Sequence, residues 1–232
     1  MRLVSIQVGK PVTLGQADAA NPDDRSWTTG FFKASVTGPV YVGKTNLEGD
    51  GQADLKNHGG VDKAICAYSK DHWAYWETEF SLHLANGAFG ENFTIEGATE
   101  RDVCIGDIYR CGGALLQVSQ PRQPCWKLAR RWRLKDLPVR IEQTGRTGWY
   151  FRVLEEGTIE APAEITLLQR LCPEWTLQAA NEVMHHKKQD WQAARSLAAV
   201  PELSESWRAS LSKRAASQTV APTTTRLTAP EM

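Results

Sequence analysis

The chain has 232 residues, of which 41% are hydrophobic and 23% charged, a composition typical of globular proteins. Its 27 basic and 27 acidic residues give a formal net charge of zero, which argues against a nucleic acid polymer as partner. No stretch approaches the ~20 apolar residues of a membrane span, so no membrane partner is expected. The first residues, MRLVSIQVGK, lack the apolar core of a signal peptide, and the five cysteines are an odd number. We therefore expect reduced thiols and a cytoplasmic location.

Residues 1–170 predict mostly β structure. Short runs rich in Val, Ile, Leu and aromatic residues, separated by Gly, Pro, Asn and Asp, indicate strands. These runs lie within 2–9, 33–43, 63–68, 92–97, 113–120, 148–157 and 164–171. Two glycine-closed segments, 105–118 and 148–168, predict hairpins. Because the strands do not alternate regularly with helices, a closed or nearly closed barrel is favoured.

Two helices interrupt this pattern. Residues 69–80 place aromatic side chains at helical spacing, and residues 125–141 form a basic helical stretch that Pro138 should break or bend. Further along, 171–217 predicts three short helices, with Thr176 and Asp190 as N-caps.

The three helices should form a small subdomain that docks on the barrel. His185 and His186 are expected to face solvent, and 218–232 has too few large apolar groups to be ordered by itself. The predicted fold is thus mostly β with α: a barrel over 1–170, a three-helix subdomain over 171–217 and a disordered tail over 218–232.

The stretch QVSQPRQPCW, residues 117–126, carries two prolines where a strand should end. Proline fixes its own φ and restricts the residue before it, so Pro121 and Pro124 preset the backbone around Arg122 and Cys125. One interpretation is a rigid turn with an incidental buried cysteine. The other is a site that holds a thiolate beside a fixed positive charge.

Three further stretches, 47–64, 87–94 and 144–153, combine glycine with polar residues outside the predicted strand cores. Glycine lets the backbone approach a ligand closely, and successive N–H groups in turns bind anions. Each stretch alone could be a tight turn, but four in one barrel favour a shared pocket. His58, in NHGG, is either structural or catalytic, and Lys33 is either an exposed edge charge or a site residue.

The blocks LEGDGQADLKNHGGVDKAICAY, GAFGENFTIEG, VSQPRQPCWKL and GRTGWYFRVLEEG occur in this order. Together they resemble the MOSC domain, the C-terminal domain of molybdenum cofactor sulfurases, over roughly residues 3–170. The three helices resemble those of the bacterial YiiM group. The resemblance implies a MOSC-type β-barrel that binds the molybdenum cofactor (molybdopterin), with Cys125 as the ligand to molybdenum or as a carrier of sulfur. No lysine motif supports pyridoxal phosphate.

The resemblance also implies an oxidoreductase that reduces N-hydroxylated compounds, such as amidoximes and base analogues of the 6-N-hydroxylaminopurine type. Nothing in the chain resembles a flavin or iron–sulfur module, so electrons should come from a separate flavoprotein or iron–sulfur protein. The alternative is a carrier that uses Cys125 to hand sulfur or the cofactor to another enzyme.

The cofactor phosphate that the resemblance implies needs basic and amide partners, and the thiolate needs a nearby cation. Arg122 and His58 are expected beside Cys125 in catalysis. The expected cofactor-binding residues are Thr29, Lys33, Asn92, Arg122, Cys125 and Arg146. The other four cysteines should be structural. Lys33 and Arg146 fit no buried apolar position in the strand pattern, so replacing them should hardly affect folding.

Overall fold

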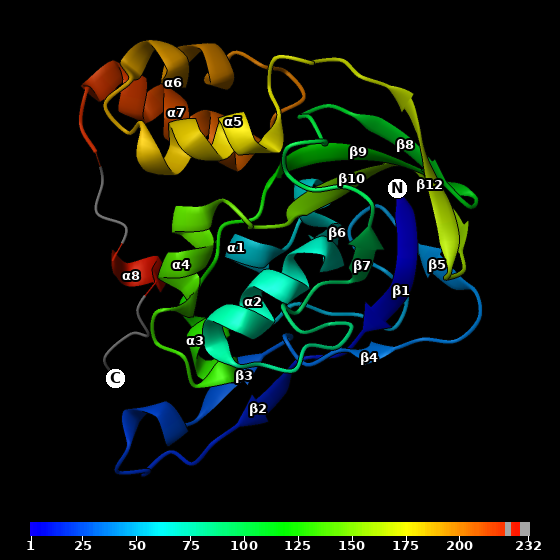
Figure 1. Cartoon of the computed structure of the whole chain (residues 1–232), viewed down its shortest axis with the longest axis vertical. Helices are drawn as coiled ribbons and strands as arrows, with labels where there is room; N and C mark the ends of the chain where they lie inside the picture. Colours follow the sequence, from blue (N-terminus) through cyan, green and yellow to red (C-terminus); the bar gives the residue numbers. More distant parts are fainter. Residues whose placement is uncertain (221–223, 228–232) are drawn as a thin grey trace.

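A computed structural model describes residues 1–220 and 224–227, and Figure 1 shows their arrangement. In this part of the chain seven strands close into a barrel in the order β12-β8-β9-β10-β6-β7-β1, and β12 pairs again with β1. The predicted fold class is confirmed. The strands of the barrel are β1 (Arg2–Val8), β6 (Ile65–Ser69), β7 (Phe93–Glu96), β8 (Ile108–Cys111), β9 (Ala114–Pro121), β10 (Trp149–Glu155) and β12 (Ala163–Gln169).

The barrel pairs are antiparallel except for β6 with β7. Alternate side chains of these strands point inward and fill the interior, as period-2 strands require. The fully buried set includes Leu3, Ile6, Ile65, Phe93, Ile95, Leu116, Val118 and Phe151.

Short strands decorate the barrel: β2 (Val12–Leu14) pairs with β3 (Trp27–Thr29), β4 (Ala34–Ser35) extends the sheet beside β1, and β5 (Val40–Val42) pairs with β11 (Gly157–Ile159). The predicted hairpin over 105–118 is confirmed as β8 and β9. The predicted hairpin over 148–168 is wrong. After β10 the chain leaves to pair with β5, and β12 then closes the barrel between β8 and β1.

Helices cover one side of the barrel. The predicted helix over 69–80 is a 3-10 turn, capped by the Ser69 hydroxyl, followed by α2 (Trp73–Phe80). The predicted helix over 125–141 is two helices, α3 (Trp126–Trp132) and α4 (Leu137–Thr144). Arg133, at φ 54°, ends α3, and Pro138 lies in the first turn of α4, where a missing N–H costs nothing. A short helix, α1 (Leu55–His58), lies in the loop before β6.

The three-helix unit lies together at one end of the barrel, at the top of Figure 1. It contains α5 (Leu177–Asn181) with a π-helical extension over Glu182–His186, α6 (Trp191–Ala198) and α7 (Glu205–Ser217). Thr176 and Asp190 cap as predicted. His186 is exposed, but His185 is not: it is buried and lies 3.4 Å from a carboxylate oxygen of Glu142 in α4. The expectation that His185 faces solvent is therefore wrong, because the extension of α5 packs against α4 through this side chain.

The predicted tail, 218–232, lies partly outside the described residues. Within it the structure has a helical turn, α8 (Thr224–Leu227), whose Arg226 pairs with Glu142 and donates to the carbonyl oxygen of Pro124. No described helix has both the length and the apolar content to cross a lipid bilayer.

Candidate functional site

The proline-bearing turn joins the end of β9 to the start of α3. Cys125 is the N-cap residue of α3, and the backbone N–H of Arg122 donates to the carbonyl oxygen of Gly148 at 2.9 Å. Gly148 has φ +71°, and a Cβ there would collide with the carbonyl oxygen of Ala67, so only glycine fits. The N–H of Gly148 donates in turn to the buried Glu100 at 2.7 Å. The turn is therefore held by hydrogen bonds as well as by its prolines.

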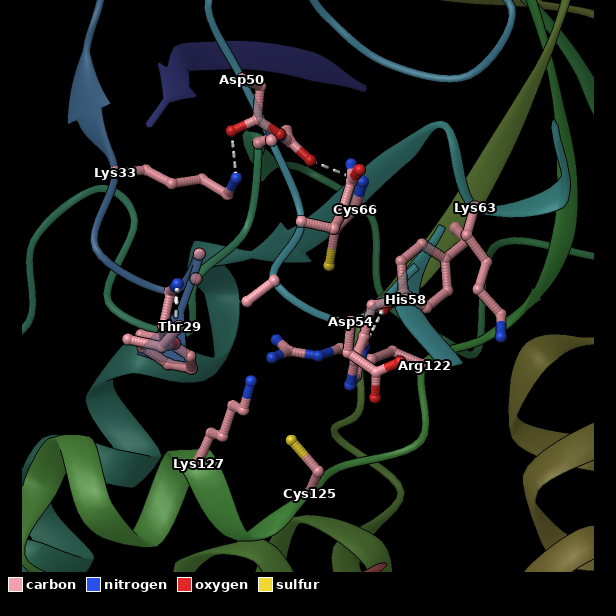
Figure 2. Close-up of a pocket in the computed structure, with 18 residues that line it drawn as sticks. Thr29, Lys33, Asp50, Asp54, His58, Lys63, Cys66, Arg122, Cys125 and Lys127 are labelled. Carbon is pink, nitrogen blue, oxygen red and sulfur yellow. Dashed lines mark hydrogen bonds and ion pairs between the residues drawn. The ribbon is translucent and has the colours of Figure 1, made fainter. Parts of the chain in front are cut away.

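Residues from all of the predicted stretches meet in one pocket, shown in Figure 2. It has a cavity volume of about 80 Å³. Six of the seven candidate residues line it: Thr29, Lys33, His58, Asn92, Arg122 and Cys125.

Arg146 is the exception. It lines a separate cavity with His72 and Arg101, and its guanidinium lies 3.9 Å from the ring centroid of Tyr75 in α2. The expectation that Arg146 reaches the shared pocket is wrong, because its side chain packs outward on that ring.

Lys33 and Asn92 are held at the pocket wall by Asp50, a residue that the sequence did not single out. Asp50 forms an ion pair with Lys33 (Figure 2). It also accepts from the amide of Asn92 at 2.8 Å and from the N–H of Gly9 at 2.9 Å. The side chains of Lys33 and Asp50 are 5% and 0% exposed. The interpretation of Lys33 as an edge charge is thus excluded. Its burial beside Asp50 also argues against the expectation that replacing it would hardly affect folding.

Asn92 also ties two strands together. Its side-chain oxygen accepts from the N–H of Cys66 at 3.1 Å, and its amide donates to the backbone of Gln7 at 3.2 Å. These bonds use both ends of the amide, so Asn92 shapes the pocket more than it offers free groups to a ligand.

Arg122 contributes a positive charge to the pocket, and the buried carboxyl of Glu91 acts on it without forming an ion pair. It is 7% exposed, and among the described residues its guanidinium has no hydrogen-bond or ion-pair partner. Figure 2 shows Arg122, Lys127 and Cys125 pointing toward one another into the pocket. A guanidinium stays protonated in proteins, and burying it without an anion is costly. The pocket is therefore built to receive a negative group beside Cys125.

Two thiols line the pocket with different exposures. Of the five cysteines Cys125 is partly exposed and the others are buried. Cys66 lies in a strand, as expected, yet it also faces the pocket. Burial raises the pKa of the Cys66 thiol, which keeps it protonated at neutral pH. Cys125 is therefore the more accessible of the two thiols.

His58 and Tyr150 form the border of the pocket. Nδ1 of His58 lies 3.5 Å from the Tyr150 hydroxyl, a long hydrogen bond. Burial, with the charge of Arg122 second, lowers the pKa of His58 to about 4. His58 is thus a neutral imidazole at pH 7. It can accept a proton on one nitrogen and donate one from the other, but it is not charged at the start of a reaction.

A wider cleft of about 390 Å³ adjoins the pocket and shares six residues with it, including His58, Cys125 and Tyr150. Its other walls include Ser206 of α7 and Arg226 of α8. The two spaces together reach the size of a usual ligand site, which the inner cavity alone does not.

Sequence reasoning missed Asp50, Cys66, Lys127 and Tyr150. Asp50 and Lys127 lie within or directly beside the glycine-rich and proline-rich stretches, so proximity to these motifs was an available signal. Cys66 and Tyr150 face each other across β6 and β10, and no local pattern tells which face of a strand borders a pocket.

Comparison with known proteins agrees with this architecture. Residues 54–166 match the family described as MOSC domain, and residues 175–218 match the family described as YiiM-like, 3-alpha helix domain. Protein YiiM of Escherichia coli is 40% identical over 186 residues, which cover 78% of this chain and 82% of that protein. A protein named Reductase, from Gibberella moniliformis, is 37% identical over 161 residues, 68% of this chain but 28% of that protein.

The crystal structure of YiiM from Geobacillus stearothermophilus superimposes with a TM-score of 0.78 at 44% identity, covering 92% of this chain and 98% of that chain. The two matched families occur in the same order as the barrel and the helical unit, and the structural likeness covers nearly the whole chain. The chain therefore belongs to the YiiM-like proteins of the MOSC family.

Proposed function

We propose that this protein is a molybdenum-cofactor-dependent oxidoreductase that reduces N-hydroxylated compounds, with Cys125 as the protein ligand to molybdenum. The observation that carries the proposal is the accessible thiol of Cys125 beside Arg122, a nearly buried cation whose guanidinium has no hydrogen-bond or ion-pair partner among the described residues. The fungal relative named Reductase supports the reaction class.

The donor set fits such a cofactor. Molybdenum is soft enough to take a thiolate, and Arg122 and Lys127 supply positive charge for a phosphate, whereas the charge of Lys33 is offset by Asp50. No group of three or more His, Cys, Asp or Glu side chains that could hold a metal occurs in the part of the chain described. A metal bound here would need further ligands from a cofactor, and a dithiolene provides them.

Reduction of an N-hydroxyl group follows R–NHOH + 2e⁻ + 2H⁺ → R–NH₂ + H₂O, so the N–O bond breaks and water leaves. The bound cofactor would supply the electron pair. The chain's own residues hold the anionic groups through Arg122 and Lys127, and the Tyr150 hydroxyl next to neutral His58 can pass protons at the pocket border. We propose a separate flavoprotein or iron–sulfur protein as the electron source.

The test is metal analysis and N-hydroxy reduction, with a reduced dye as electron donor, on protein from a host that makes the cofactor. Cys125→Ala should lose both molybdenum and activity. Cys104→Ala, at a buried thiol outside the pocket, is the matched control and should keep both if circular dichroism shows it folded. Equal loss from the two folded variants would refute the role of Cys125. A persulfide on Cys125 without metal would instead support the alternative carrier function.

A further inference from the structure

The outer part of the wide cleft, toward α7 and α8, has no role in the proposal above. Resting on that proposed function, we propose that this cleft binds the substrate and selects N-hydroxylated compounds that carry a negative charge, such as nucleoside phosphates. The three-helix unit then acts as a wall of the substrate site.

The first argument is access. The cleft shares Cys125, His58 and Tyr150 with the inner pocket, so a ligand in it reaches the thiol without passing another barrier. Gln123 and Trp126, next to Cys125 in sequence, add an amide and a ring to the lining. A polar aromatic group fits such a surface.

The second argument is that the wall is fixed. The N–H of Ser204 donates to the carbonyl oxygen of Ser119 in β9 at 2.9 Å, and the N–H of Glu205 donates to Asp62 at 2.9 Å. The hydroxyl of Ser206 donates to the side-chain oxygen of Gln120 at 3.2 Å. These contacts hold the first turn of α7 against the barrel, and Ser206 faces the cleft.

The third argument is charge. Lys56 and Lys63 line the cleft together with Lys127, which the proposed function assigns to the cofactor's anionic group. Within residues 1–220 and 224–227 none of the three forms an ion pair with a carboxylate. Among the described residues the cleft has one carboxylate, Asp54, which caps α1 by accepting from the N–H of Asn57 at 3.0 Å. It offsets one of the three lysine charges, so the cleft keeps a net positive charge. Arg226 differs, because Glu142 neutralises it. Lys56 does not line the inner pocket, so its charge acts on whatever occupies the cleft.

Calorimetric titration with adenosine 5′-monophosphate and with adenosine tests the selection without needing turnover. The wild type should bind the phosphorylated probe at least about tenfold more tightly, since each ~1.4 kcal/mol is a factor of ten and a charge-assisted contact reaches that size. Lys56→Glu should remove the preference, whereas Lys135→Glu, an equal charge change at an exposed position outside the cleft, should keep it.

Two further variants test the wall. Ser206→Phe should weaken binding of both probes, and Ser212→Phe, at another exposed position of α7, should not. Equal affinities of the wild type for the two probes would overturn the inference. Loss of molybdenum from Lys56→Glu would also overturn it, because the cleft would then belong to the cofactor. Failure of the loaded wild type to reduce any N-hydroxylated compound would instead refute the proposed function.

Discussion

Replacing Asp50 with alanine should destabilise the protein far more than replacing a surface carboxylate. The change leaves the ammonium of Lys33, 5% exposed, without its counter-charge. It also removes the acceptor for Asn92 and Gly9. Breaking a buried pair by removing one partner costs about 3–5 kcal/mol, because the remaining charge stays buried. The lost hydrogen bonds belong to the same network, so we do not add them to this figure.

Urea unfolding of the cofactor-free protein at pH 7 measures this cost. The matched control is Glu155→Ala, which breaks an exposed pair with Arg110 and should cost at most about 1 kcal/mol. The double variant Lys33→Met with Asp50→Ala should be more stable than Asp50→Ala alone, since it buries no unpaired charge. If Asp50→Ala costs no more than Glu155→Ala, or the double variant recovers nothing, Lys33 turns into solvent and the pair does not hold the pocket wall.

Three other outcomes are expected. The unfolded chain binds a proton at His58 between pH 6.5 and about 4 that the folded chain does not, so the free energy of unfolding should fall by up to about 3 kcal/mol as the pH drops through this window. In His58→Gln, the free energy of unfolding measured with urea should change less with pH in this window. An unchanged pH dependence would contradict the lowered pKa of His58. Iodoacetamide should label Cys125 well before the four buried thiols in peptide mapping by mass spectrometry, and uniform labelling would show the pocket to be closed. Arg146→Ala should retain molybdenum like the wild type whereas Arg122→Ala should lose it, and equal retention would remove Arg122 from the cofactor site.

Features that depend on interactions between neighbouring residues could be predicted from the sequence. The turn at Arg122 and Cys125 was predictable because prolines constrain their own neighbours, and the caps at Thr176 and Asp190 were predictable for the same local reason. The barrel could be inferred from the many short strands and from the resemblance together.

Long-range relations were not predictable in this way. The ion pair of Lys33 with Asp50 depends on how two loops pack, and the outward position of Arg146 depends on the ring of Tyr75 in another element. The pairing of β12 with β8 and β1, rather than with β10, is likewise set by closure of the whole sheet. The hydrophobic pattern of a strand indicates which of its residues are buried but not which other strand it pairs with.

The pairing of β1 with β12 has a consequence for how the molecule reaches its native state. Arg2 lies opposite Glu164, so the barrel closes only when nearly the whole domain has been synthesised. Contacts between such distant residues carry a high loop-closure cost and slow the folding rate. Until β12 arrives, β1 and β8 expose unpaired backbone edges that can associate with other chains. The nascent chain should therefore depend on chaperones most strongly just before β12 leaves the ribosome.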